Sequence, residues 1–171
     1  ANGAANAISL TDGVVINGNS YTANGYSSQE SSFWGNDAWY KFTATNCGDS
    51  AAVNICLPAT AAANYVALVI RRASDNAVLF PPANDASYYA IVNSGSCFQY
   101  SYYDYNISNW VYVTPKIQVT PGESYYVIVD GYNSGIDFTV AYNEISNSPD
   151  SDGDGIPDCA DSCPFTPGQV G

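Results

Sequence analysis

The amino-acid sequence predicts an all-β fold of the β-sandwich class. Two observations support this prediction. Short segments rich in β-branched and aromatic residues recur through residues 8–145 and are separated by turns of Gly, Asn, Ser and Pro. Helical periodicity is otherwise absent, and the one helix candidate is a single turn within residues 2–10.

The first predicted strands are the most regular. Residues 37–44 alternate and are rich in aromatic side chains, and residues 51–56 follow a Cys-Gly-Asp-Ser turn. Residues 65–70 form a continuous apolar run, as expected of a strand that is buried on both faces. Alternation and these apolar runs predict a core that includes Trp39, Phe42, Leu68, Ile70, Val127 and Val129.

Two strand pairs are predicted in the second half of the chain. Residues 110–113 and 116–119 are expected to pair, with the pair interrupted at Pro115. Residues 125–130 and 136–142 are expected to form the last hairpin, because a Gly/Asn-rich turn separates them.

Composition and charge exclude several classes of function. The 171 residues carry a net charge of −12, with 16 acidic residues against four basic ones, so nucleic acid and anionic membrane surfaces are not expected partners. The chain has no His, which excludes His general-base catalysis and His-ligated zinc. No apolar run approaches the roughly 18 residues of a membrane span. We interpret Ala1 as a processed start of an exported, extracellular protein.

The sequence does not predict an enzyme. No Gly-x-Ser-x-Gly nucleophile elbow is present. Paired carboxylates for glycoside hydrolysis would have to come from scattered aspartates, namely Asp37, Asp104, Asp130 and Asp137. Turn chemistry explains Asp37 and Asp130, which lie at the ends of predicted strands.

The most informative segment is aspartate-rich and lies near the C-terminus. Carboxylates stand at positions 1, 3, 5, 9 and 12 of residues 150–161, with Gly155 at position 6 for a sharp turn and the Ile156 carbonyl at position 7. This is the ligand spacing that calcium needs in a loop. The predicted calcium ligands are Asp150, Asp152, Asp154, Ile156, Asp158 and Asp161.

The flanks of this loop exclude an EF-hand. Pro149 precedes the loop and Pro164 follows it, and prolines so placed stop helices. Residues 150–164 resemble a thrombospondin type 3 repeat, since Asp-x-Asp-x-Asp-Gly-x-x-Asp-x-x-Asp-x-Cys-Pro is matched at every defined position. That resemblance implies a non-catalytic, calcium-stiffened connector over residues 147–171, usually one of several in tandem. Because a single repeat is present, we expect the chain to be a fragment, a processed product or one unit of a longer array.

A second resemblance covers residues 4–143. Residues 5–10, the Asp-Ala-Trp-Tyr-Lys-Phe-Thr-Ala segment at 37–44 and the Pro-Gly-Glu-Ser-Tyr-Tyr segment that opens residues 121–132 occur in order. Together they are similar to the bacterial pre-peptidase C-terminal domain, a jelly-roll β-sandwich of secreted and cell-surface proteins. The resemblance implies a jelly-roll-like sandwich over residues 1–146 that serves as an accessory or adhesive module. The chain departs from that family's acidic cluster after Cys97, where only Asp104 remains, so a second calcium site is not expected there.

Five cysteines leave an odd one in an oxidising compartment. Cys47 and Cys56 flank a turn at unequal distances and are poor cross-strand neighbours, so a Cys56–Cys97 disulfide with Cys47 unpaired is favoured. Cys159 and Cys163 lie close together in the tail, where either they pair locally or one reaches a following repeat.

A tyrosine-rich stretch is the candidate binding surface. Tyrosine is amphipathic and stacks on sugars or on neighbouring subunits, although alternate members of such a stretch can simply face the core. The candidate contacts with a subunit or glycan are Tyr100, Tyr102, Tyr103, Tyr105 and Trp110. Asn106 begins the one Asn-x-Ser/Thr sequon and is expected in an exposed loop.

Two classes of function remain. The first is a structural unit of a bacterial surface fibre or long adhesin, which associates head to tail or as tandem repeats through calcium-stiffened connectors. The alternative is a module that tethers a secreted enzyme to carbohydrate or cell wall. The tyrosine-rich, charge-poor surface and the single incomplete connector favour the structural unit.

Overall fold

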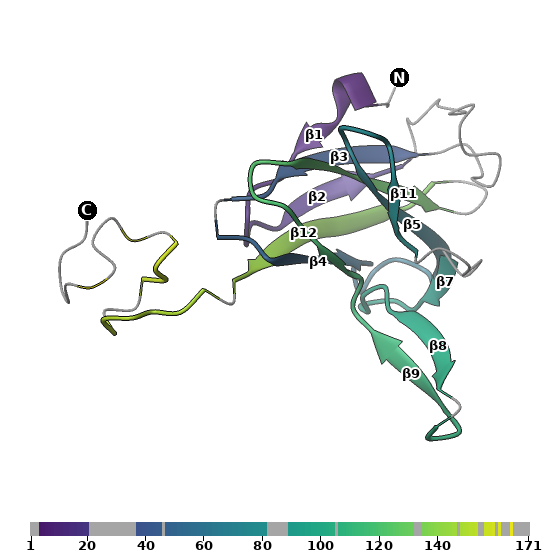
Figure 1. Cartoon of the computed structure of the whole chain (residues 1–171). Helices are drawn as coiled ribbons and strands as arrows, with labels where there is room; N and C mark the ends of the chain where they lie inside the picture. Colours follow the sequence, from purple (N-terminus) through teal and green to yellow (C-terminus); the bar gives the residue numbers. More distant parts are fainter. Residues whose placement is uncertain are drawn as a thin grey trace.

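The computed structural model describes residues 4–20, 37–45, 47–81, 89–104, 106–131, 135–146, 148–153, 156–159, 161 and 165. Two β-sheets pack face to face as a β-sandwich, and a two-stranded hairpin projects from it (Figure 1). The elements are η1 (Ala4–Asn6), β1 (Ile8–Ser9), β2 (Ile16–Asn19), β3 (Ala38–Thr43), β4 (Ser50–Cys56), β5 (Asn64–Arg72), β6 (Val78–Phe80), β7 (Tyr89–Val92), β8 (Tyr100–Asp104), β9 (Asn109–Val113), β10 (Lys116–Gln118), β11 (Ser124–Gly131) and β12 (Asp137–Ile145).

The larger sheet is built around β11. Its order is β1-β3-β11-β5-β6, and β7 also pairs with β5. Every pairing in it is antiparallel except the short parallel contact between β1 and β3. The smaller sheet has the order β10-β4-β12-β2 and is antiparallel throughout. The all-β sandwich that the sequence predicts is therefore confirmed.

The prediction that residues 125–130 and 136–142 form a hairpin is wrong. β11 has β3 on one side and β5 on the other, so no edge is open to β12. The chain instead crosses to the smaller sheet, where β12 lies between β4 and β2. A hairpin and a crossover between sheets would both bury apolar residues such as Val127 and Val140, so the local pattern cannot distinguish them.

The predicted pairing of residues 110–113 with 116–119 is also wrong. β9 pairs with β8, whereas β10 pairs with β4. The buried Pro115 separates the two strands, and its carbonyl accepts a hydrogen bond from the Val53 N–H at 2.9 Å. This bond places the residues after Pro115 on β4 and leaves β9 to extend from the sandwich with β8.

The predicted core is confirmed, and it has two parts. The main cluster lies between the sheets and includes Phe42, Leu68 and Ile70. A smaller cluster of Trp39, Val69 and Ile128 covers the outer face of the larger sheet. β5 contributes to both clusters, which explains why its sequence is apolar without alternation. The six residues predicted to be buried, Trp39, Phe42, Leu68, Ile70, Val127 and Val129, are all buried.

Aromatic side chains fill the space between the sheets. The ring of Phe42 stacks on Tyr142 from the opposite sheet, with ring centroids 4.3 Å apart, and Tyr40 meets Phe138 edge-on at 6.0 Å. Gly18 on β2 lies directly against these rings, and a Cβ atom there would come within 2.6 Å of Phe138 and still closer to the Tyr40 hydroxyl. A glycine is therefore required for this close approach.

The N-terminal turn expected within residues 2–10 is present as the short 3₁₀ turn η1. Within the described residues, no helix has the length and apolar character needed to cross a membrane.

Candidate functional site

The aspartate-rich loop follows β12 at the end of the sandwich where β3 turns into β4 (Figure 1). Asp150, at position 1, accepts a hydrogen bond through Oδ1 from the Gly153 N–H at 2.8 Å. Gly153 has a φ of +76°, which a side chain would disfavour. The chain therefore begins to curl around the first carboxylate.

Asp158, at position 9, is fixed to the start of the loop. Its carboxylate accepts hydrogen bonds from the Ser151 N–H at 2.8 Å and the Ser151 hydroxyl at 2.7 Å. Its backbone N–H donates to the Pro149 carbonyl at 2.8 Å. These three bonds connect the two halves of the loop.

Two further predicted ligands have a carboxylate oxygen shielded from solvent. These are Oδ2 of Asp152 and Oδ2 of Asp161. The Asp161 N–H donates to the Pro157 carbonyl at 3.0 Å, so position 12 is reached through a tight backbone turn. Ile156 is half-buried, and Asp154 lies outside the described residues.

The donor set of this loop fits a hard cation. Carboxylate and carbonyl oxygens are the ligands that calcium prefers, and Asp150, Asp152, Ile156, Asp158 and Asp161 offer only such atoms. Within the described part of the chain, no group of three or more acidic, His or Cys side chains is already drawn together as for a metal ion.

The disulfides tie distant segments together. Cys56 at the end of β4 is bonded to Cys97, the pairing that the sequence favoured. Cys47 is bonded to Cys159, so the predictions of an unpaired Cys47 and of a local Cys159–Cys163 pair are wrong. The sequence separation of 112 between Cys47 and Cys159 explains this error, because the contact depends on where the loop lies against the sandwich. Cys163 lies outside the described residues.

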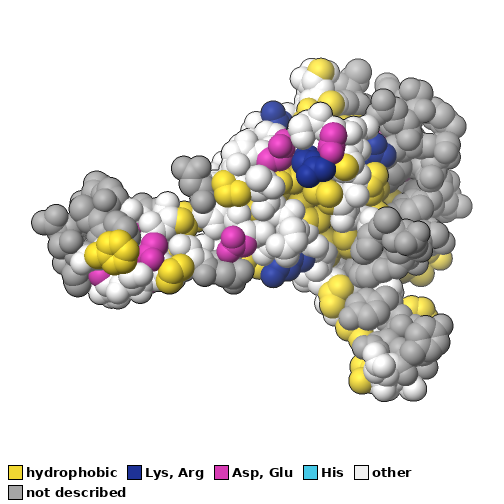
Figure 2. Space-filling view, viewed as in Figure 1, with side chains coloured by type: hydrophobic (Ala, Val, Ile, Leu, Met, Phe, Trp, Pro, Cys, Tyr) yellow, Lys and Arg dark blue, Asp and Glu magenta, His cyan; other side chains and the backbone are white. Residues whose placement is uncertain are grey.

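We call residues 89–113 the arm. They comprise β7, the segment that follows it, and the projecting hairpin of β8 and β9. β8 carries Tyr100, Tyr102 and Tyr103, whose backbones pair with Val113, Val111 and Trp110. Trp110 is 55% exposed and Tyr112 62% exposed. Hydrophobic side chains stand on the surface of this part in Figure 2.

Other members of the tyrosine-rich stretch differ from this surface. Phe98, which precedes the candidate contact residues in sequence, is buried in the main core. Tyr105 lies outside the described residues. Asn106 is exposed in the turn between β8 and β9, as its sequon suggested.

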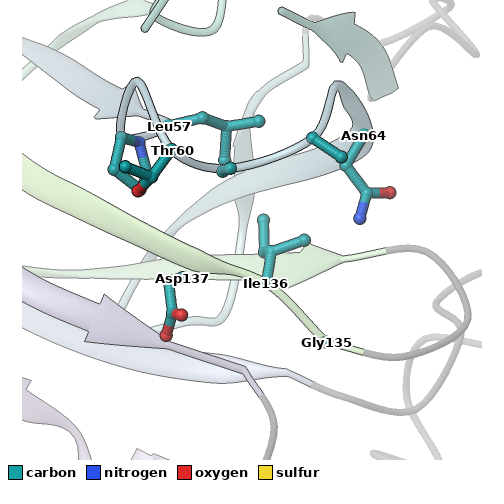
Figure 3. A pocket seen from close by; sticks show the side chains of 9 residues that line it. Leu57, Thr60, Asn64, Gly135, Ile136 and Asp137 are labelled. Carbon is teal, nitrogen blue, oxygen red and sulfur yellow. The ribbon is translucent and has the colours of Figure 1, made fainter. Parts of the chain in front are cut away.

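An open cavity of about 370 Å³ lies between residues 57–64 and the start of β12. Figure 3 shows Ile136 between the Asn64 amide on one side and the Asp137 carboxylate on the other. No aromatic side chain is among the described residues that line it, so it lacks the stacking platform of a typical sugar site.

The sequence did not predict that two aspartates are buried. Turn chemistry at strand ends was the expected role of Asp37 and Asp130, but their side chains are in fact 1% and 0% exposed. They lie next to the Ala38–Val129 pair at adjacent ends of β3 and β11, and both interact with neighbouring groups. The signal available in the sequence was an aspartate directly bordering an apolar strand.

Comparisons with known proteins give similarity to solved structures alone. No family model and no curated protein sequence matches the chain. The pre-peptidase C-terminal domain of a collagenase from Bacillus anthracis is 15% identical over 81% of this chain and 93% of that domain, with a TM-score of 0.39. CorA, a surface-associated copper-binding protein of Methylomicrobium album, is 7% identical over 81% of this chain and 98% of that one, with a TM-score of 0.43. Similarities of this size identify no family, and the β-sandwich assignment rests on the two sheets described above.

Proposed function

We propose that this chain is a non-catalytic, extracellular structural unit of a bacterial surface fibre or long adhesin, and that its C-terminal loop binds calcium. The observation that supports this most is the internal bonding of the loop. Ser151 donates two hydrogen bonds to the Asp158 carboxylate, and the Gly153 N–H donates one to Asp150, so two of the proposed ligands are held in place by groups of the loop itself.

Electrostatics supports calcium as the ligand. Five aspartates within residues 150–161 repel one another. A divalent cation bound among them offsets this repulsion. A carboxylate-rich loop of flexible geometry suits calcium better than magnesium, which requires a small octahedral shell and keeps its waters.

The proposed location outside the cell is supported by the disulfides. Cys47–Cys159 and Cys56–Cys97 both join segments far apart in sequence. Such bonds persist in oxidising compartments and are rare where thiol reductants are abundant.

Self-association is the second part of the proposal, and the arm is its proposed contact with a second copy of the chain. Residues 89–113 contain a single charged residue, Asp104, whereas the whole chain has a net charge of −12. Two copies repel through most of their surface, so a segment with a single charged residue is where they can meet at least electrostatic cost. Trp110 and Tyr112 provide the exposed aromatic surface that such contacts favour.

Calorimetry tests the calcium site. The wild-type chain should bind one Ca²⁺, and Asp154→Ala should weaken that affinity by about 10-fold or more by removing a central ligand. Asp137→Ala, which removes an exposed carboxylate on β12, is the matched control and should leave the affinity unchanged. Absence of binding by the wild type, or equal affinity in Asp154→Ala, would contradict the proposal.

Sedimentation and negative-stain electron microscopy test assembly. In millimolar calcium the wild-type chain should associate, and a chelator should shorten or dissolve the assemblies. Trp110→Ser should reduce association, whereas Val15→Ser, at an exposed site on the sandwich, should not. A wild type that stays monomeric at high concentration and is retained on polysaccharide would instead support the alternative, a carbohydrate- or cell-wall-binding accessory module.

A further inference from the structure

The Cys47–Cys159 disulfide enters the aspartate-rich loop among its proposed ligands. Cys159 occupies loop position 10, directly after Asp158 at position 9 and two residues before Asp161 at position 12. Its partner, Cys47, lies in the turn between β3 and β4. The second half of the loop is therefore covalently attached to the sandwich, rather than connected to it only through β12.

The turn that carries Cys47 is itself firmly held. The Thr45 N–H donates to both carboxylate oxygens of Glu144 on β12, at 2.9 and 3.1 Å, and the Thr45 hydroxyl donates to the same carboxylate. The Glu144 N–H donates to the Asp12 carboxylate at 2.8 Å. Beyond Cys47, the Asp49 N–H donates to the Ile145 carbonyl at 3.1 Å. Cys47 therefore lies in a turn that hydrogen bonds connect to β12 of the smaller sheet.

The loop is equally well held around Cys159. The Cys159 N–H donates to the Ser148 hydroxyl at 3.3 Å, and the Ser148 N–H donates to the Ser146 hydroxyl at 3.1 Å. Asp158, the neighbouring proposed ligand, is bonded to Ser151 as described above. Displacing Cys159 would therefore disturb both the entry to the loop and its ninth position.

We propose that the Cys47–Cys159 disulfide couples calcium binding by the loop to the folding of the sandwich. This inference rests on the proposed calcium site. The disulfide limits the positions open to Asp158 and Asp161, so less conformational freedom is lost when an ion binds. The same bond fixes the loop to a turn of the sandwich. An ion that binds the folded loop but not the unfolded chain therefore also stabilises the folded sandwich.

A pair of double variants tests the coupling. In Cys47→Ser/Cys159→Ser, the calcium affinity measured by calorimetry should fall by about 10- to 100-fold, the usual effect of removing a group that positions ligands. The rise in the unfolding temperature of the sandwich on adding calcium should also be lost. Cys56→Ser/Cys97→Ser removes a disulfide away from the loop, and it should lower the unfolding temperature while retaining the wild-type calcium affinity.

The outcomes separate this inference from the proposed function. If the wild type binds no calcium, both fail. If the wild type binds calcium and the Cys47→Ser/Cys159→Ser variant binds it equally well, with the same thermal stabilisation, the coupling alone is overturned.

A measurement on the unaltered protein covers the case in which the Cys47→Ser/Cys159→Ser variant does not fold. Calcium should slow amide hydrogen exchange in the turn at residues 44–49, which contains no proposed ligand. Slower exchange within residues 150–161 alone, with residues 44–49 unchanged, would overturn the coupling and leave the calcium site in place.

Discussion

The sandwich and the aspartate-rich loop are ordered by different interactions. The sandwich has continuous backbone ladders and a main core in which residues such as Val53, Leu68 and Val127 are fully buried. None of the described residues from 148 onward is buried, and many of the loop's bonds run between backbone groups and Asp or Ser side chains. Apolar burial therefore stabilises the sandwich, whereas the loop depends on a few polar bonds, one disulfide and, on our proposal, an ion.

The largest expected effect tests the sandwich side of this comparison. Leu68 is fully buried at the centre of β5, and Leu68→Ala should lower the free energy of unfolding by about 2–5 kcal/mol through lost burial and a residual cavity. Denaturant unfolding measures this change. Val78→Ala, at an exposed position on the neighbouring β6, should cost far less. A Leu68→Ala loss below roughly 0.5 kcal/mol would show that packing at β5 does not dominate stability.

The two regions were also predictable from sequence to different degrees. Alternation and apolar runs correctly indicated strands and burial at Trp39, Leu68 and Val129, since burial leaves a local pattern. Strand partners were not predictable in the same way, because β11 and β12 carry the same pattern whether they pair or cross between sheets.

The same division between local and long-range features holds for the candidate site. Ligand spacing in residues 150–161 is a local property, so the aspartates could be proposed directly from the sequence. The bond from Cys47 to Cys159 could not, because no spacing rule links positions 112 residues apart. The burial of Asp130 at a strand end likewise depends on the sheet around it.

The second prediction concerns a polar group inside the apolar sandwich. Burial raises the pKa of Tyr40 from 10.0 to about 12. The stability contributed by its neutral form is complete below pH 10 and is lost as the pH rises toward 12, by about 1.4 kcal/mol per pH unit. Tyr40→Phe should flatten the decline in stability over this interval in pH-dependent denaturation. An unchanged slope in Tyr40→Phe would contradict the assignment.

The third prediction addresses the junction between the two regions. Glu144 accepts three hydrogen bonds from Thr45 with both carboxylate oxygens. Glu144→Gln replaces one acceptor with a donor and should cost about 1–2 kcal/mol in the free energy of unfolding. Glu123→Gln is the matched control, because the Glu123 carboxylate accepts a longer bond of 3.4 Å from the Ser124 N–H. Equal losses in the two variants would show that the Glu144 contacts do not specifically hold the turn.

The smallest expected effect comes from the exposed turn between β5 and β6. Arg72 donates to both carboxylate oxygens of Asp75 at 2.9 and 2.6 Å, and the Ala77 N–H donates to the same side chain at 3.1 Å. The hydrogen bonds from Arg72 and then from Ala77 lower the pKa of Asp75 from 3.8 to about 2. The contribution of this carboxylate is therefore present above pH 3.8 and is lost as the pH falls toward 2.

Both side chains of this pair are well exposed, at 37% and 50%, so water and salt screen their attraction. Asp75→Asn should leave the unfolding midpoint at pH 7 within experimental error and alter only the acid limb of the stability curve. Titration of the Asp75 carboxyl carbon by NMR measures the cause directly, and Arg72→Gln should raise that pKa toward its ordinary value. A large loss of stability at pH 7 in Asp75→Asn would contradict the view that the sandwich is stabilised by apolar burial and that exposed ion pairs contribute little to it.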